Sequence, residues 1–192
     1  MKELLFKTIY NHPQIKLSDL NLIMDVHEKV YFSKGDFLLQ VGAKAAEYFI
    51  VEKGLMRSFV YDTNGNDITT DFFGEGDIAI EVSSLFMGIP SQENIQTLTE
   101  GHAWKITFDD FQNLFHTVEG ISEWGRAWFS QQLFSAKQRS IDMITKSAPD
   151  RYLYLEKNKP QIIKNAPLKH IASYLGVTDT SLSRIRKEIH SN

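Results

Sequence analysis

The stretch 168–187 reads LKHIASYLGVTDTSLSRIRK, and its pattern predicts two short helices joined by a glycine turn. Pro167 suits the first helical position, where its missing N–H would have no partner in any case. Gly176 suits the left-handed residue that ends a helix, and the Thr178 hydroxyl can cap the helix that follows. Ala172 leaves room where the two helices would cross. The stretch therefore predicts a helix-turn-helix.

The second helix of this motif would bury Leu182, Ile185 and Ile189 and turn a basic, hydroxyl-rich face outward. Arginine can donate two hydrogen bonds to a guanine edge, short hydroxyls reach bases or phosphates, and lysine meets the DNA backbone. The predicted DNA-binding residues are Thr178, Asp179, Thr180, Ser181, Ser183, Arg184 and Lys187. The alternative interpretation is an ordinary amphipathic hairpin with a polar face.

The distribution of charge also sets the C-terminal part apart. The whole chain carries a net charge of −3, yet from Lys137 onward eleven Lys and Arg residues stand against five Asp and Glu residues. A basic terminal quarter in an acidic chain indicates a polyanionic partner. A solvated surface with no partner is the alternative.

Composition bounds the class of protein. The chain has 192 residues, of which 42% are hydrophobic and 12% aromatic, enough for a packed core. The lack of cysteine excludes disulfides, iron–sulfur clusters, thiolate zinc sites and thiol redox sensing. The N-terminal segment has no apolar run long enough for a signal peptide or a membrane span. These features predict a cytoplasmic protein that does not associate with membranes.

Residues 28–108 are predicted to form strands. Short apolar or alternating runs are separated there by turn glycines, which indicates a sandwich or a barrel. The clearest hairpin is 61–67, where asparagine and glycine tolerate the positive φ of a tight turn. The runs are KVYF, DFLLQ, EYFIVEKG, LMRSFVYD and DITTDFF, followed by ENIQTLTEGHAWKITF.

Residues 109–144 contain no proline and show apolar residues at helical spacing. One apolar row has the alternating spacing of a coiled-coil seam, and its members are Phe129, Leu133, Ala136, Ser140 and Met143. A second row lies on another side of the helix and contains Ile121, Trp124 and Trp128. A helix with two apolar faces needs two surfaces to pack against. The prediction is the chain's own β-domain on one face and a second copy on the other, hence a homodimer; a helix buried within a monomer is the alternative.

The stretch LKHIASYLGVTDTSLSRIRK resembles the DNA-reading segment of the Crp/Fnr transcription regulators, the family of the cyclic-AMP receptor protein. The preceding RYLYLEKNKPQIIKNAP resembles a Bacteroidetes-type branch. The resemblance implies an α+β fold in three parts. These are a jelly-roll, cyclic-nucleotide-binding-like β-roll with an N-terminal helix (1–108), a dimerisation helix (109–146) and a helix-turn-helix domain (147–192). It also implies an incomplete wing, because only Glu188 to Asn192 follow the motif.

Carried over by position, the resemblance places base-contacting residues at Asp179, Thr180 and Arg184. It implies that two paired chains bind double-stranded DNA at a near-palindromic operator. The further partners that it implies are RNA polymerase and a small-molecule effector.

The resemblance also locates an effector site in the β-roll. Family members that bind cyclic nucleotides carry a Gly-Glu pair and, about ten residues later, an arginine for the phosphate. In GEGDIAIEVSSLFMGIPSQENIQ (74–96), Glu81 can stand for the glutamate, but Ile80 replaces the glycine and Gln92 to Asn94 replace the arginine. A buried phosphate needs a cation or several donors. We therefore predict no bound cofactor and no cyclic-AMP binding of the usual kind.

Two alternatives remain for the roll. It could bind a small uncharged or cationic effector, or it could be a vestigial scaffold that senses nothing. The candidate effector-binding residues are Glu81, Ser83, Ser84, Gln92 and Asn94.

The sequence offers little support for other chemistry. Its six histidines show no close ligand spacing, so no metal site is predicted. No nucleophile–base set or phosphate loop argues for an enzyme. The competing class is a protein-interaction module whose terminal hairpin docks a partner. DNA binding through Lys and Arg weakens steeply with salt, whereas apolar docking does not.

Overall fold

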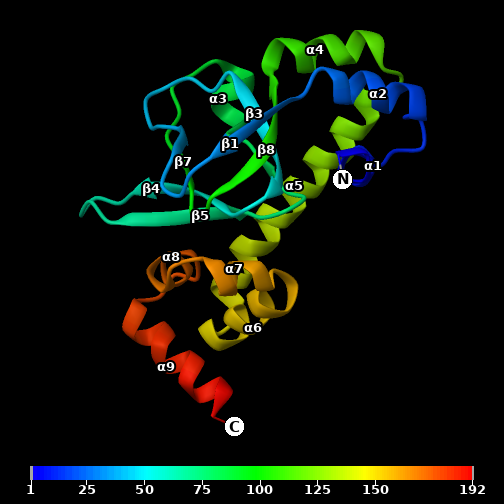
Figure 1. The fold of residues 1–192 in the computed structure, drawn as a ribbon. Coiled ribbons are helices and arrows are strands. Elements are labelled where there is room, and N and C mark those ends of the chain that lie inside the picture. Colours follow the sequence, from blue (N-terminus) through cyan, green and yellow to red (C-terminus); the bar gives the residue numbers. More distant parts are fainter. Residues whose placement is uncertain (1, 192) are drawn as a thin grey trace.

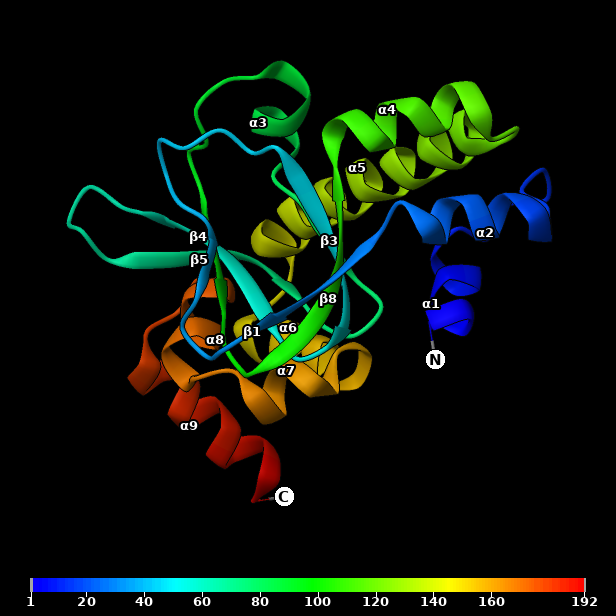
Figure 2. The same cartoon turned by 45° about the horizontal axis from the view of Figure 1, so that its top comes forward.

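A computed structural model describes residues 2–191, which form a β-domain, a long helix and a helical C-terminal region (Figures 1 and 2). The strands form two four-stranded sheets, ordered β1-β8-β3-β6 and β2-β7-β4-β5. Their bounds are β1 Glu28–Phe32, β2 Phe37–Leu39, β3 Glu47–Lys53, β4 Met56–Tyr61, β5 Asp67–Phe73, β6 Ile78–Ala79, β7 Asn94–Thr97 and β8 Gly101–Thr107. The mixed α+β class implied by the resemblance is confirmed, and the strands that the turn spacing assigned to a sandwich or a barrel form two sheets.

Helices precede, interrupt and follow the strands. Their bounds are α1 Lys2–Ile9, α2 Leu17–Asp25, α3 Val82–Met87, α4 Phe108–Thr117, α5 Ile121–Thr145, α6 Ala148–Asn158, α7 Pro160–Asn165, α8 Leu168–Tyr174 and α9 Asp179–His190. None of these helices, within residues 2–191, has the length and apolarity needed to cross a membrane.

The predicted hairpin at 61–67 is confirmed as the β4–β5 connection, with Tyr61 paired to Asp67. The Asp62 carboxylate accepts the backbone N–H groups of Asn64 at 2.8 Å and Asn66 at 2.9 Å, and Gly65 takes φ of 81°. The Asp62 side chain thus supplies hydrogen bonds to backbone N–H groups of the loop that are not paired in the β-ladder. The hairpin projects well beyond the rest of its sheet (Figure 1).

The segment predicted as one dimerisation helix, 109–146, is two helices. The backbone is extended at Val118, and Gly120 is left-handed with φ of 88° at the start of α5. A Cβ on Gly120 would approach the Cβ of Gln14 at 2.6 Å, so the close approach of the N-terminal segment also requires glycine here. The long helix accordingly starts at Ile121 and has α4 folded back beside it.

The second apolar row of the long helix is buried against the chain itself. Ile121 and Trp124 are buried in a cluster with α1, α2 and α4, and the Trp124 indole donates to the Ile9 carbonyl at 2.7 Å. Trp128 is half-buried and stacks on Trp124. This face thus meets the N-terminal helices as well as the β-domain.

A separate apolar cluster joins the C-terminal helices to the β-domain. Leu55, Phe72 and Leu98 of the β-domain share it with buried side chains of α6–α9. Those helical members are Tyr152, Leu155, Ile162, Ile171, Ala172, Leu175 and Leu182. The helical region is therefore docked on the sheet that contains β4 and β5.

Candidate functional site

The turn between α8 and α9 has the geometry predicted for a helix-turn-helix. Gly176 takes φ of 67°, its N–H donates to the Ser173 carbonyl, and the N–H of Val177 donates to the Ala172 carbonyl at 3.0 Å. These two hydrogen bonds form the pattern of a Schellman motif, which ends a helix at a left-handed glycine. The Thr178 hydroxyl then accepts the N–H of Ser181 at 3.2 Å and starts α9.

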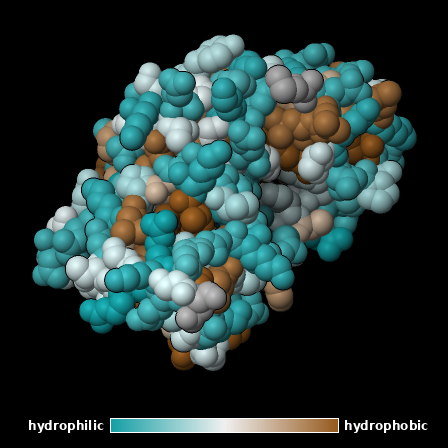
Figure 3. All heavy atoms as spheres, turned by 60° about the horizontal axis from the view of Figure 1, so that its bottom comes forward, coloured by the Kyte–Doolittle hydropathy of each residue, from teal (hydrophilic) through white to brown (hydrophobic). Residues whose placement is uncertain are grey.

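The outer face of α9 presents most of the predicted DNA-binding set to solvent. The exposed members are Thr178, Asp179, Thr180, Ser183, Arg184 and Lys187. Ser181 is half-buried, and its hydroxyl lies 2.9 Å from that of Thr178, so it serves the cap. Leu182 on the opposite side is fully buried. Figure 3 turns the C-terminal side of the molecule toward the reader and shows hydrophilic residues with hydrophobic patches between them.

The basic residues of α9 differ in their surroundings: two are exposed and form no ion pair among residues 2–191, and one packs near α6. Within residues 2–191, neither Arg184 nor Lys187 forms an ion pair, so both charges remain available to an incoming anion. Arg186 is half-buried and lies near Tyr152 of α6, where burial raises the pKa of the Tyr152 phenol and the Arg186 charge opposes that shift. Arg184 and Lys187 therefore carry the free positive charge of this face.

Buried Arg57 connects the roll to the helix-turn-helix, a contact that sequence reasoning missed. Its Nη1 donates to Nδ1 of His170 on α8 at 2.7 Å, and its Nη2 donates to Asp67 at 2.9 Å and to Gln96 at 3.2 Å. Burial and the Arg57 charge lower the pKa of His170 to about 4. The imidazole is thus neutral at pH 7 and can accept the bond.

Two further contacts hold α8 against β5, beside which it lies in Figure 1. The Ser173 hydroxyl accepts the backbone N–H of Thr69 at 3.1 Å. Arg139 of the long helix donates to the Thr70 carbonyl at 2.8 Å and to the Tyr174 carbonyl at 3.1 Å. Strand β5, helix α5 and helix α8 are joined by these bonds, so the roll and the helix-turn-helix have a defined relative pose.

Three of the five predicted effector-binding residues are buried and bonded within the roll. The Glu81 carboxylate caps α3 by accepting the N–H of Ser84 at 2.6 Å and the hydroxyl of Ser83. Ser84 donates to the Ile89 carbonyl and accepts the N–H of Ala45. Asn94 is buried, and its Oδ1 accepts the N–H of Val41 at 3.0 Å. Gln92 is exposed and Ser83 half-buried.

Glu93, which the sequence interpretation did not include, adds a second carboxyl to this region. Burial and the charge of Glu81 raise the pKa of Glu93, although hydrogen bonds from Thr70 and Ser58 oppose the shift. The Asn94 Nδ2 group is buried without a hydrogen-bond partner in residues 2–191. Two acids and an unpaired amide donor give this part of the roll an acidic, polar character.

Histidine and carboxylate side chains do not gather into a metal-like cluster. Within residues 2–191, no three or more of them lie in positions that could hold one ion. His27 and His170 are the two buried histidines, and His27 bonds to the Ile23 carbonyl at 2.6 Å. Burial lowers the pKa of His27 to about 4.

Comparison with known proteins identifies the class of the β-domain. Residues 29–118 match the family described as cyclic nucleotide-binding domain. A search of curated protein sequences finds no match. The predicted cyclic-nucleotide-binding-like roll is thereby confirmed as to fold.

Solved structures match far more of the chain. FixK2 from Bradyrhizobium japonicum has a TM-score of 0.75 and 16% identity over 86% of this chain and 85% of its own. The c-di-GMP-responsive global regulator CLP of Xanthomonas campestris has a TM-score of 0.69 and 14% identity over 92% of each chain. A protein from Eubacterium rectale assigned to the Crp/Fnr family of transcriptional regulators has a TM-score of 0.70 and 15% identity over 95% of this chain and 88% of its own. The chain thus has the fold of Crp/Fnr regulators, with a cyclic nucleotide-binding domain followed by helices.

Proposed function

We propose that the chain is a dimeric, sequence-specific DNA-binding regulator of transcription and not an enzyme. The observation that carries the proposal is the exposed face of α9, with Arg184 and Lys187 free of ion pairs in the described residues. A helix in this position of a helix-turn-helix can enter the major groove. The fold shared with regulators such as CLP supports the same function.

The proposed dimer uses the first apolar row of α5. Leu133 has 73% of its surface exposed, and Ala136 and Ser140 beside it are also exposed. Phe129 is half-buried against Phe86, whose ring lies 5.3 Å from it. Pairing of two copies would cover this row and place the two α9 helices in successive major grooves of a near-palindromic operator. RNA polymerase and a small-molecule effector are the further partners in this proposal.

We expect Arg184→Ala to weaken binding to the preferred DNA sequence by roughly 5- to 150-fold, because a bidentate arginine–guanine contact contributes about 1–3 kcal/mol of discrimination. Specificity at one base pair of each half-site should relax as well. Genomic DNA fragments selected by the wild-type protein supply the operator, and fluorescence anisotropy measures the affinity. Lys187→Ala is the matched comparison, since loss of a phosphate contact weakens all sequences alike and lowers the salt slope.

Unchanged base preference in Arg184→Ala would refute its reading role. If the affinity for the binding partner did not change with salt concentration, the DNA-binding proposal would be refuted and the protein-interaction module favoured. A near-palindrome in the selected fragments would agree with two-fold symmetry.

The roll is proposed not to take cyclic AMP in the usual manner. Glu81 and Glu93 would face a phosphate with like charge, and the pKa of Glu93 is already raised by burial and by Glu81. Lys105, the basic residue nearest to them downstream in the sequence, pairs with Glu28 at 3.2 Å and Glu47 at 3.6 Å. Calorimetric titration of the wild-type protein should show no binding of cyclic AMP at micromolar concentrations. A micromolar dissociation constant would contradict this expectation.

A further inference from the structure

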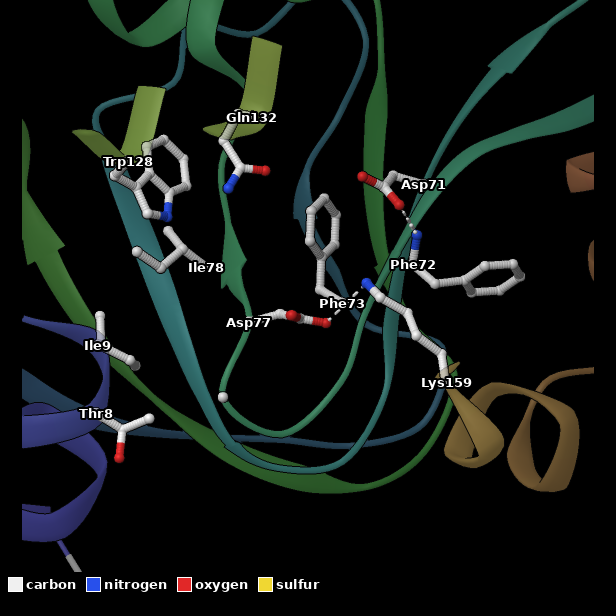
Figure 4. A pocket seen from close by; sticks show the side chains of 11 residues that line it. Thr8, Ile9, Asp71, Phe72, Phe73, Asp77, Ile78, Trp128, Gln132 and Lys159 are labelled. Carbon is white, nitrogen blue, oxygen red and sulfur yellow. Dashed lines mark hydrogen bonds and ion pairs between the residues drawn. The ribbon is translucent and has the colours of Figure 1, made fainter. Parts of the chain in front are cut away.

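A cavity of about 250 Å³ lies at the junction of the roll, the long helix and the helical C-terminal region (Figure 4). Trp128 and Gln132 of α5 line one side of it, and Phe73 and Asp77 from the end of β5 and the turn before β6 line another. Lys159, between α6 and α7, reaches in from the C-terminal region. No residue of this cavity belongs to the predicted effector set in the roll.

The carboxylates of the cavity are unequally satisfied. Asp77 accepts the N–H of Gly74 at 2.9 Å and lies 3.3 Å from Lys159 Nζ. Asp71 accepts only the N–H of Phe72, at 2.8 Å, and forms no ion pair with any residue from 2 to 191. Lys159 and Arg139 both act on Asp71 through their charge without pairing with it, since Lys159 pairs with Asp77 and the hydrogen bonds of Arg139 go to the carbonyls of Thr70 and Tyr174. Asp71 therefore shares the charge of Lys159 with Asp77 and has no ion-pair partner of its own among residues 2–191.

The local electrostatics favour positive charge. Asp71 is an exposed residue of the cavity wall, yet protein surrounds its carboxyl closely enough that burial raises its pKa. Burial would lower the pKa of Lys159, but the charges of Asp77 and Asp71 outweigh it and raise that pKa. The shift of Lys159 runs in the direction that the two carboxylates produce, whereas that of Asp71 follows from burial, which the charges of Lys159 and Arg139 oppose.

The apolar part of the cavity has its own chemical preference. The Trp128 indole stacks on Trp124, with ring centroids 6.4 Å apart, and Ile78 stands near it in Figure 4, while Phe73 stands farther off, toward Asp71. Aromatic faces attract cations and accept apolar bodies. A volume of about 250 Å³ corresponds to about eight water molecules at about 30 Å³ each, and so to a ligand of comparable size.

We infer that this junction cavity binds a small organic amine, with its ammonium group at Asp71 and its apolar body against Trp128 and Phe73. An anion of the same size would meet two carboxylates against the one ammonium of Lys159, which already pairs with Asp77, and a neutral molecule would leave Asp71 without an ion-pair partner. The inference does not depend on the proposed function, because binding is measured without DNA.

The first experiment titrates wild-type protein with three probes of nearly equal size by isothermal calorimetry at pH 7. Benzylammonium should bind at least tenfold more tightly than benzyl alcohol, its neutral isostere, and benzoate should not bind. Tenfold corresponds to about 1.4 kcal/mol, within the range of one charge-assisted contact. Equal affinity for the amine and the alcohol, or no amine binding below about 10 mM, would overturn the inference.

The second experiment uses Asp71→Asn, which keeps the shape of the side chain and breaks no ion pair of the described residues. Benzylammonium affinity should fall about tenfold, while the thermal unfolding midpoint of the free protein should not fall. Glu75→Gln, an exposed position in the following turn that does not line the cavity, is the matched control and should bind like wild type. An Asp71→Asn variant that binds the amine as tightly as the control would also overturn the inference. If that variant does not fold, the comparison of the three probes on wild-type protein decides.

Discussion

Replacing Arg57 with methionine is expected to lower the free energy of unfolding by about 2–4 kcal/mol. Removing one partner of a fully buried ion pair costs about 3–5 kcal/mol, because the other charge stays buried and unpaired. The cost should be somewhat smaller here, because the Asp67 side chain is 28% exposed whereas that of Arg57 is 2% exposed. Methionine keeps much of the volume and the apolar stem, so the loss reports the guanidinium and its bonds.

Urea unfolding followed by far-ultraviolet circular dichroism measures this change. Arg126→Met is the matched control, since Arg126 pairs with Glu123 on the surface of α5 and both side chains are well exposed. Such a pair contributes about 0–1 kcal/mol. Equal losses in the two variants would show that the Arg57 cluster does not hold α8 on the sheet.

Leu133→Asp is expected to convert the proposed dimer into a monomer. A two-fold interface would lose the burial of two leucines, at about 1.5–3 kcal/mol each, and would bring two like charges together. The dissociation constant should therefore rise at least about 100-fold. Because Leu133 is 73% exposed in a single chain, the monomer itself should remain folded.

Sedimentation equilibrium over a range of protein concentrations measures the association. Gln131→Asp is the matched control, because Gln131 is also exposed on α5 but lies on the opposite side of the helix from the apolar row. A Leu133→Asp variant that remains dimeric would assign the interface to another surface. Loss of the dimer in Gln131→Asp alone would do the same.

The helix-turn-helix and most strands could be predicted from the sequence because their signals are local. The signals lie within one short segment: Gly176 is left-handed, Thr178 caps α9 and Leu182 is buried, as their residue types predict. The interruption of the long helix could not be predicted in the same way. Gly120, which takes a left-handed conformation there, lies against Gln14, more than a hundred residues away along the chain.

The contact between the roll and the helix-turn-helix could not be predicted from the sequence either. Arg57 and His170 are 113 positions apart, and neither residue belongs to a recognisable spacing. An arginine in a strand usually extends to solvent, and nothing near Arg57 in the sequence indicates that it is 2% exposed. The same applies to the junction cavity, whose walls come from four separate parts of the chain.

The apolar cluster that Leu55, Phe72 and Leu98 share with the C-terminal helices has a consequence for folding. Separating the two regions would expose apolar surface on both, so unfolding of one region destabilises the other. Denaturation should consequently proceed in one cooperative step for the sheet and the C-terminal helices together. A fragment cut before α6 would carry Phe72 and its neighbours uncovered and would tend to self-associate.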